Sequence, residues 1–173
     1  MKIGSLSENL SIEKRVSITP EIVKKYNSLG FEVLLSKDYG FHLGYDNEQY
    51  KSQGANIIEN EKDILTDSDV ILQLGLPTDD NLSLLKENQN LIGVLNPFLN
   101  KEKLEKLSKR KINNFSLELL PRITRAQSMD ILSSQANLAG YKAVIESFAN
   151  FEKAIPMMMT AAGTVPAAKV LVV

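Results

Sequence analysis

With 173 residues, the chain can form one ordinary domain or one domain and a piece of a second, and 20 Lys and Arg against 21 Asp and Glu leave no charge excess that favours nucleic acid or an anionic membrane. It has no cysteine and one histidine, His42, which excludes disulfides, thiolate chemistry and a histidine metal cluster. No signal segment opens the sequence, and no apolar run approaches the roughly 18 residues of a membrane span, so we interpret the chain as cytosolic.

The first third of the sequence predicts a strand, a helix and a second strand. Residues 2–6 form the first apolar strand. Thr19 followed by Pro20 is typical of a helix start, and Gly30 of a helix end. Residues 31–35 follow as the second strand. This βαβ order indicates the beginning of a mostly parallel sheet.

The middle of the sequence continues the alternation. Strands are predicted at 70–74, 91–95 and 114–120, with a brief one at 57–58. Helical segments are predicted at 46–53, 61–66, 80–86 and 101–109. The fold class predicted from this order is α/β, with a doubly wound, mostly parallel open sheet flanked by helices.

The last third predicts a long helix over residues 125–151, which would span roughly 35–40 Å and suits a connection between two domains. Residues 157–161 are ambiguous, with a turn of helix as one interpretation, and 163–166 predict a turn. Residues 168–173 predict a buried strand.

Four polar residues around the start of the long helix form the main candidate site: Arg122, Gln127, Asp130 and Ser133. Gln127, Asp130 and Ser133 recur at helical spacing, so they would share a polar face, and Arg122 precedes it. Their donors and acceptors suit a polar planar ligand at a helix N-terminus. A solvated helix face explains the same pattern, as a surface arginine would explain the loop residue Arg15.

Three segments carry a resemblance to a known family. They are residues 15–20 (RVSITP), 120–141 (LPRITRAQSMDILSSQANLAGY) and 160–172 (TAAGTVPAAKVLV). Together they resemble the N-terminal part of the alpha subunit of proton-translocating NAD(P) transhydrogenases, in the family that also contains alanine dehydrogenase. The resemblance covers essentially the whole chain and is most specific in the second segment.

The resemblance separates the two branches of that family. Alanine dehydrogenases hold their oxo acid with an arginine that Arg15 matches, a lysine after the middle strand and a histidine after the next strand. Here Gly75 follows the middle strand without a lysine, and Asn96 stands where the histidine would be. The transhydrogenase branch needs neither group, because hydride passes between two nicotinamide rings. In that branch, positions matching Arg122, Gln127, Asp130 and Ser133 lie beside the nicotinamide and ribose of NAD.

The resemblance therefore implies an NAD(H)-binding component, with NADP(H) on a partner subunit, membrane components that translocate protons, a homodimer, and a peripheral place at the cytoplasmic face of the inner membrane. It divides the chain into an N-terminal α/β domain (1–124), a connecting helix (125–151) and the start of a Rossmann domain (152–173). The glycine-rich loop of that domain is expected beyond Val173, so we expect a fragment that is inactive alone. An alanine dehydrogenase-like enzyme and a purely structural or dimerisation fragment are the alternatives.

Overall fold

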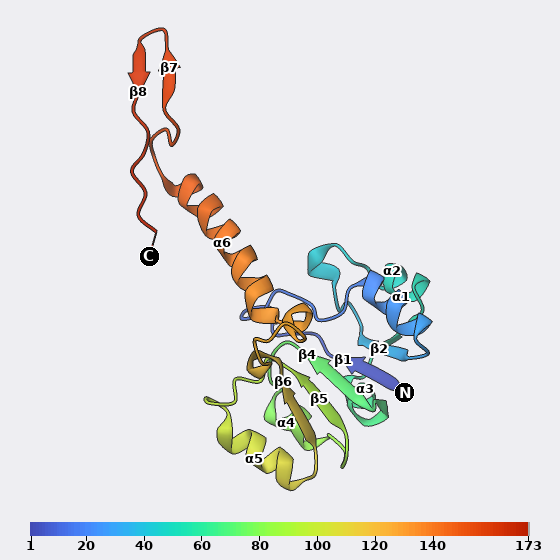
Figure 1. Ribbon diagram of the computed structural model, residues 1–173. Helices are drawn as coiled ribbons and strands as arrows, with labels where there is room; N and C mark the ends of the chain where they lie inside the picture. Colours follow the sequence, from blue (N-terminus) through green and yellow to red (C-terminus); the bar gives the residue numbers. More distant parts are fainter. Residues whose placement is uncertain (173) are drawn as a thin grey trace. The chain divides into compact units, whose positions relative to one another are not determined.

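The computed structural model describes residues 1–172, which fall into two compact units divided between Ala126 and Gln127 (Figure 1). The first unit holds a six-stranded sheet and most of the helices. The second holds one long helix and a two-stranded hairpin.

All pairings in the six-stranded sheet are parallel, and the strand order is β3-β2-β1-β4-β5-β6. The strands are β1 (Lys2–Ser5), β2 (Glu32–Ser36), β3 (Ala55–Ile58), β4 (Val70–Gln73), β5 (Asn90–Gly93) and β6 (Asn113–Ser116). The order grows outward from β1 in one direction and from β4 in the other. The predicted doubly wound α/β sheet is thereby confirmed.

Helices cover both faces of this sheet. They are α1 (Pro20–Ser28), α2 (Asn47–Ser52), α3 (Glu61–Asp67), α4 (Asp79–Ser83) and α5 (Lys101–Lys109), with the short 3-10 helices η1 (Phe41–Leu43) and η2 (Leu117–Leu119). The predicted start at Thr19 and Pro20 is confirmed, although the Thr19 side chain makes no capping bond. Asp46 caps α2 through a reciprocal capping box with Gln49.

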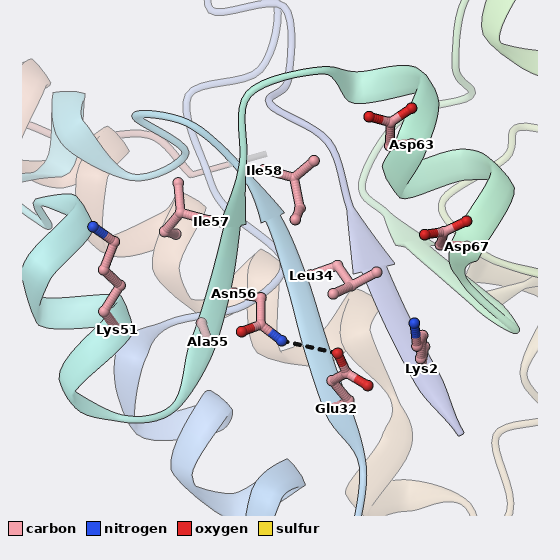
Figure 2. A pocket seen from close by; sticks show the side chains of 10 residues that line it. All are labelled: Lys2, Glu32, Leu34, Lys51, Ala55, Asn56, Ile57, Ile58, Asp63 and Asp67. Atoms are coloured by element: carbon pink, nitrogen blue, oxygen red, sulfur yellow. Dashed lines mark hydrogen bonds between the residues drawn. The ribbon is translucent and has the colours of Figure 1, made fainter.

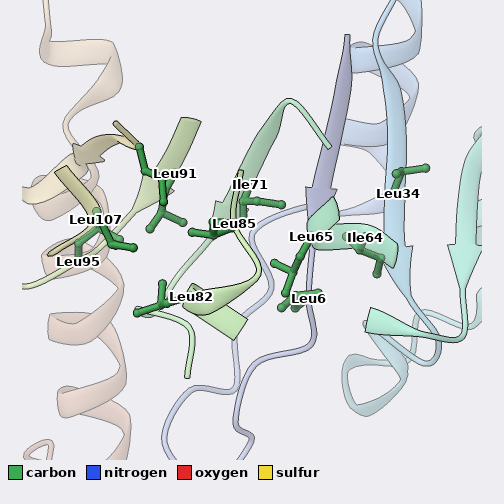
Figure 3. Packing of buried hydrophobic residues seen from close by; sticks show 11 residues of the cluster. Leu6, Leu34, Ile64, Leu65, Ile71, Leu82, Leu85, Leu91, Leu95 and Leu107 are labelled. Atoms are coloured by element: carbon green, nitrogen blue, oxygen red, sulfur yellow. The ribbon is translucent and has the colours of Figure 1, made fainter. Parts of the chain in front are cut away.

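Two apolar clusters form the core, one on each face, because successive side chains of a strand point to opposite sides. In β2, Leu34 joins one cluster, while Val33 and Leu35 join the other. The Leu34 cluster contains side chains from α3, α4 and α5 (Figure 3). The Val33 cluster packs against α1 and α2.

Two predicted elements of the first unit are shorter than expected. The strand predicted at 114–120 ends at Ser116, because Gly93 at the end of β5 is its last pairing partner. The helix predicted at 80–86 ends at Ser83. The Arg110 guanidinium donates to the carbonyl oxygens of Leu82, Ser83 and Leu85 at 2.7, 3.0 and 2.7 Å, so a side chain satisfies the end of this short helix.

The second unit departs further from the prediction. The long helix, α6 (Ile131–Asn150), begins six residues later than the predicted residue 125, because the backbone first forms the 3-10 helix η3 (Gln127–Met129) and Asp130 then acts as the N-cap. No helix within residues 1–172 is both long enough and apolar enough to cross a membrane.

The hairpin of strands β7 (Met158–Thr160) and β8 (Gly163–Val165) replaces the predicted turn of helix and turn. The strand predicted at 168–173 is wrong over residues 168–172, which pair with no strand among the described residues, and Val173 lies outside the described residues. A strand needs a neighbour for its backbone N–H and C=O groups.

Candidate functional site

The four predicted site residues belong to different units. Arg122 is an exposed residue near the end of the first unit, and the other three lie in the second unit. Gln127 is exposed on the 3-10 helix η3, and Ser133 lies in the first turn of α6. The expectation that Gln127, Asp130 and Ser133 share one helical face is therefore wrong, because the helix begins only after Asp130. Their ligand-binding role stays a prediction.

Asp130 organises the start of α6. One carboxylate oxygen accepts from the backbone N–H groups of Leu132 and Ser133 at 3.0 and 3.1 Å, and the other accepts from the Ser133 hydroxyl at 2.6 Å. An N-cap aspartate satisfies two otherwise unbonded N–H groups and complements the helix dipole. This geometry fixes the Ser133 hydroxyl and leaves Gln127 as an exposed carboxamide.

A second polar site, which the sequence did not predict, lies where β1 and β4 end. These neighbouring strands are the point at which the strand order reverses. The hollow there, which we call the switch-point crevice, has a volume of about 330 Å³ and is lined by Leu6–Asn9, Ile12, Glu13, Gln73, Gly75–Thr78, Asn81, Asn100 and Lys103. The carboxyl ends of parallel strands at such a point are the usual ligand location in doubly wound sheets.

Gln73 forms the floor of the switch-point crevice. Its buried carboxamide accepts from the Leu6 N–H at 3.1 Å and donates to the Leu6 carbonyl at 3.2 Å. The paired registers between β1 and β4 stop at Gly4 and Ile71. The Gln73 side chain thus replaces backbone pairing as the two strands separate, which opens the crevice without leaving Leu6 unsatisfied.

Glu8 forms one wall. Its carboxylate accepts from the backbone N–H of Leu74 at 2.6 Å and of Gly75 at 3.4 Å. Burial raises the pKa of Glu8 above its ordinary value, and the charge of Glu13 adds to the effect, whereas the bonds from Leu74, Gln73 and Gly75 act in the opposite direction. The raised pKa means that desolvation outweighs these hydrogen bonds.

Glu13 and Arg15 form a bidentate ion pair beside that wall. Arg15 Nε donates to Glu13 Oε1 at 2.8 Å, and Nη2 donates to Oε2 at 2.6 Å. Hydrogen bonding from Arg15 lowers the pKa of Glu13, and the same bond raises the pKa of Arg15. The pair is partly exposed, so its contribution to stability is small. Its main effect is to hold Arg15 in one orientation.

A cluster of three hydroxyl groups holds this loop to the sheet. The Tyr39 hydroxyl lies 2.8 Å from both Ser5 Oγ and Ser17 Oγ, and it accepts from the N–H groups of Ser17 and Ile18 at 3.1 and 3.3 Å. Ser5 Oγ also donates to the Leu72 carbonyl at 2.6 Å. Because Tyr39 and Ser5 are buried, these bonds anchor the segment that carries Arg15 to the ends of β1 and β4.

A larger hollow of about 530 Å³ lies along the edge strand β3 (Figure 2). Its charges are mixed: Lys2 and Lys51 face the same open surface as Glu32, Asp63 and Asp67, and Asn56 bonds Glu32 at 2.9 Å. Nothing there gathers one kind of group. No set of His, Asp or Glu within residues 1–172 is arranged to hold a metal ion, and His42 bonds the Lys14 carbonyl at 2.7 Å.

The residues missed from the sequence have a common cause. Glu8 and Tyr39 lie in irregular segments, where no hydrophobic period marks which side chains turn inward. Gln73 stands at the end of a buried strand, and that position was the available signal, since polar residues at carboxyl ends of parallel strands often face a ligand crevice.

A family model described as "Alanine dehydrogenase/PNT, N-terminal domain" matches residues 4–139. The chain is 45% identical over 177 aligned residues to an NAD(P) transhydrogenase subunit alpha of Rhodospirillum rubrum, covering 99% of this chain and 46% of that protein. It is 27% identical to alanine dehydrogenase 1 of Staphylococcus aureus, over 84% of this chain and 38% of that protein. The chain thus spans about half the length of the transhydrogenase relative, or less for the second protein.

A solved structure agrees with these matches. The transhydrogenase from Sinorhizobium meliloti superposes with a TM-score of 0.90 and 40% identity, over 97% of this chain and 50% of that chain. The matched residues 4–139 include the whole parallel sheet, the switch-point crevice and the start of α6. The chain belongs to the alanine dehydrogenase/PNT family, whose N-terminal domain it contains.

Proposed function

We propose that this chain is the N-terminal part of the NAD(H)-binding component of a proton-translocating NAD(P) transhydrogenase. The observation that carries the proposal is the 45% identity to a transhydrogenase alpha subunit across 99% of the chain. In the proposed reaction, NADH held by this component supplies hydride to NADP held by a partner component. The protein's task is to bind and orient the two rings.

The chemistry of the predicted site fits a nicotinamide and its ribose. The nicotinamide carboxamide offers one acceptor and two donors, which the exposed carboxamide of Gln127 can match in either orientation. The Ser133 hydroxyl, fixed by Asp130, suits a ribose hydroxyl, and Arg122 supplies a cation for an anionic or carbonyl oxygen. We therefore assign Arg122, Gln127, Asp130 and Ser133 to the NAD(H) site of the intact protein.

The exposed apolar surface of the second unit supports a homodimer. α6 has no buried residue, and its large apolar side chains are exposed on several sides: Leu138, Tyr141, Val144, Ile145 and Phe148. A helix that is apolar all round is normally covered on most sides. We propose that a second copy of the chain covers part of α6.

We propose that the domain boundaries follow the same scheme, with residues 1–124 as the N-terminal domain, 125–151 as the connection and 152–173 as the lead into an NAD-binding domain. The division into units after Ala126 supports the first boundary. Membrane components would hold the assembly at the cytoplasmic face of the inner membrane.

Oxidation of an amino acid is less well supported. No lysine follows β4, where Gly75 stands, and Asn96 after β5 offers no imidazole for proton transfer. Its backbone N–H donates to Glu118 Oε1 at 2.5 Å, so Asn96 has a structural role at the end of β5.

A titration with NADH, followed by nicotinamide fluorescence, tests the proposal. A full-length version should bind NADH saturably, while the 173-residue chain should not saturate at millimolar NADH, because it has no glycine-rich phosphate loop. L-Alanine with NAD should give no NADH. Tight binding by the 173-residue chain would contradict the role assigned to that loop, and alanine-dependent NADH formation would favour the alternative enzyme.

A further inference from the structure

The switch-point crevice contains the groups that bind anions, but carboxylates of the protein already occupy them. An incoming anion could use the N–H groups of Leu74 and Gly75 or the guanidinium of Arg15. Glu8 accepts from both N–H groups, at 2.6 and 3.4 Å. Glu13 accepts from Arg15 at 2.8 and 2.6 Å.

The charges around the crevice also oppose an anion. Glu8 and Glu13 supply two negative charges and Arg15 one positive charge. Lys103, another cation of the lining, forms an ion pair with Asp79 at 2.7 Å. Glu8 is partly buried, where a like charge is screened less than at the surface. A ligand carboxylate would have to displace an internal carboxylate or lie beside one.

Gly75 leaves this arrangement without compensation. A Cβ atom at Gly75 would lie 3.5 Å from Glu8 Oε2, which is an ordinary contact distance, so the position has room for a side chain. The glycine supplies no positive charge that could balance Glu8. Charge balance at the crevice therefore depends on the ionisation of Glu8.

We infer that Glu8, supported by Glu13, is a specificity determinant that closes the switch-point crevice to ligands bearing a carboxylate while admitting neutral polar groups. The inference rests on the proposed function, since it explains how a nicotinamide-handling protein of this family rejects oxo acids and amino acids. It adds a physical exclusion to the absence of a catalytic imidazole.

The test follows the amide resonances of Leu74 and Gly75 in the isotope-labelled chain during titration with pyruvate, with methyl pyruvate as the uncharged control. The wild-type chain should show no saturable shift at millimolar pyruvate. Glu8→Gln keeps a carbonyl acceptor for the Leu74 N–H but removes the charge, so it should raise pyruvate affinity about tenfold or more. Affinity for methyl pyruvate should be the same in both proteins.

Two further measurements guard against a folding defect in that variant. Lowering the pH through the raised pKa of Glu8 should increase pyruvate affinity in the wild-type chain but not in Glu8→Gln. Gly75→Lys should increase it at neutral pH by pairing with Glu8. Glu59→Gln removes an equally charged but exposed group, and should change nothing.

Saturable pyruvate binding by the wild-type chain at neutral pH would overturn the inference. So would unchanged pyruvate affinity in both Glu8→Gln and Gly75→Lys. Neither result bears on NADH binding or hydride transfer, which test the proposed function separately.

Discussion

The two units of this chain differ in where their apolar side chains lie. The first unit, Met1–Ala126, buries apolar residues on both faces of its sheet. In the second unit, the 20-residue helix α6 has no buried residue. Burial of apolar area is the main favourable term in folding, so the first unit has its own source of stability while α6 does not. We conclude that the first unit is a folded platform and that α6 depends on additional contacts.

The largest expected contrast comes from one substitution made in each unit. Leu65→Ala in α3 removes a side chain with no exposed area and should lower the free energy of unfolding by about 2–5 kcal/mol. Leu138→Ala in α6 removes one that is 58% exposed and should change it by about 0.5 kcal/mol or less. Urea denaturation of both variants measures the difference. Equal losses would contradict the contrast between the units.

A smaller contrast concerns tyrosine hydroxyl groups. Tyr39→Phe removes the acceptor for the N–H groups of Ser17 and Ile18 and should cost about 1–3 kcal/mol, because these groups lie beneath the loop that carries Arg15. Tyr141→Phe, at a position 70% exposed, is the matched control and should be neutral. Thermal unfolding of the two variants compares them, and a neutral Tyr39→Phe would show that the hydroxyl cluster does not anchor the loop.

The smallest expected effect is a pH dependence confined to the first unit. The folded-state pKa of Glu8 is raised above the ordinary value of 4.5, so the folded state binds the proton more tightly. Stability therefore falls as the pH rises from about the ordinary value through the folded pKa. The lowered pKa of Glu13 has the opposite sign: its stabilisation is present above 4.5 and is lost as the pH falls through the folded value.

Unfolding of the wild type, Glu8→Gln and Glu13→Gln across this acidic range separates the two groups. Relative to wild type, Glu8→Gln should gain stability as the pH rises, and Glu13→Gln should lose stability. Parallel profiles for all three proteins would show that neither carboxylate is perturbed.

The sequence predicted the sheet well because its strands are apolar runs that alternate with amphipathic helices, as at 70–74 and 101–109. It predicted the second unit less well. The helix start was placed too early, because the polar residues before Asp130 fit a helical period although the backbone there is a 3-10 helix. Residues 157–161 are apolar without a clear period, so helix and strand could not be distinguished.

The candidate site divides in the same way. The resemblance of residues 120–141 identified Arg122, Gln127, Asp130 and Ser133, but periodicity alone could not show that Asp130 is an N-cap. Glu8 and Gln73 meet only through the pairing of β1 with β4, and they are far apart along the chain. Contacts of that kind depend on topology and were invisible in the sequence.

The central claim is that the start of α6 forms part of an NAD(H) site, and single-turnover hydride transfer from NADH to an NADP analogue tests it most directly. In a full-length version with its partner components, Gln127→Ala should slow transfer by about tenfold or more while the free energy of unfolding changes by about 0.5 kcal/mol or less, because the side chain is exposed. Gln135→Ala, within α6, is the control for a general effect on that helix. Unchanged hydride transfer in Gln127→Ala would contradict the assignment.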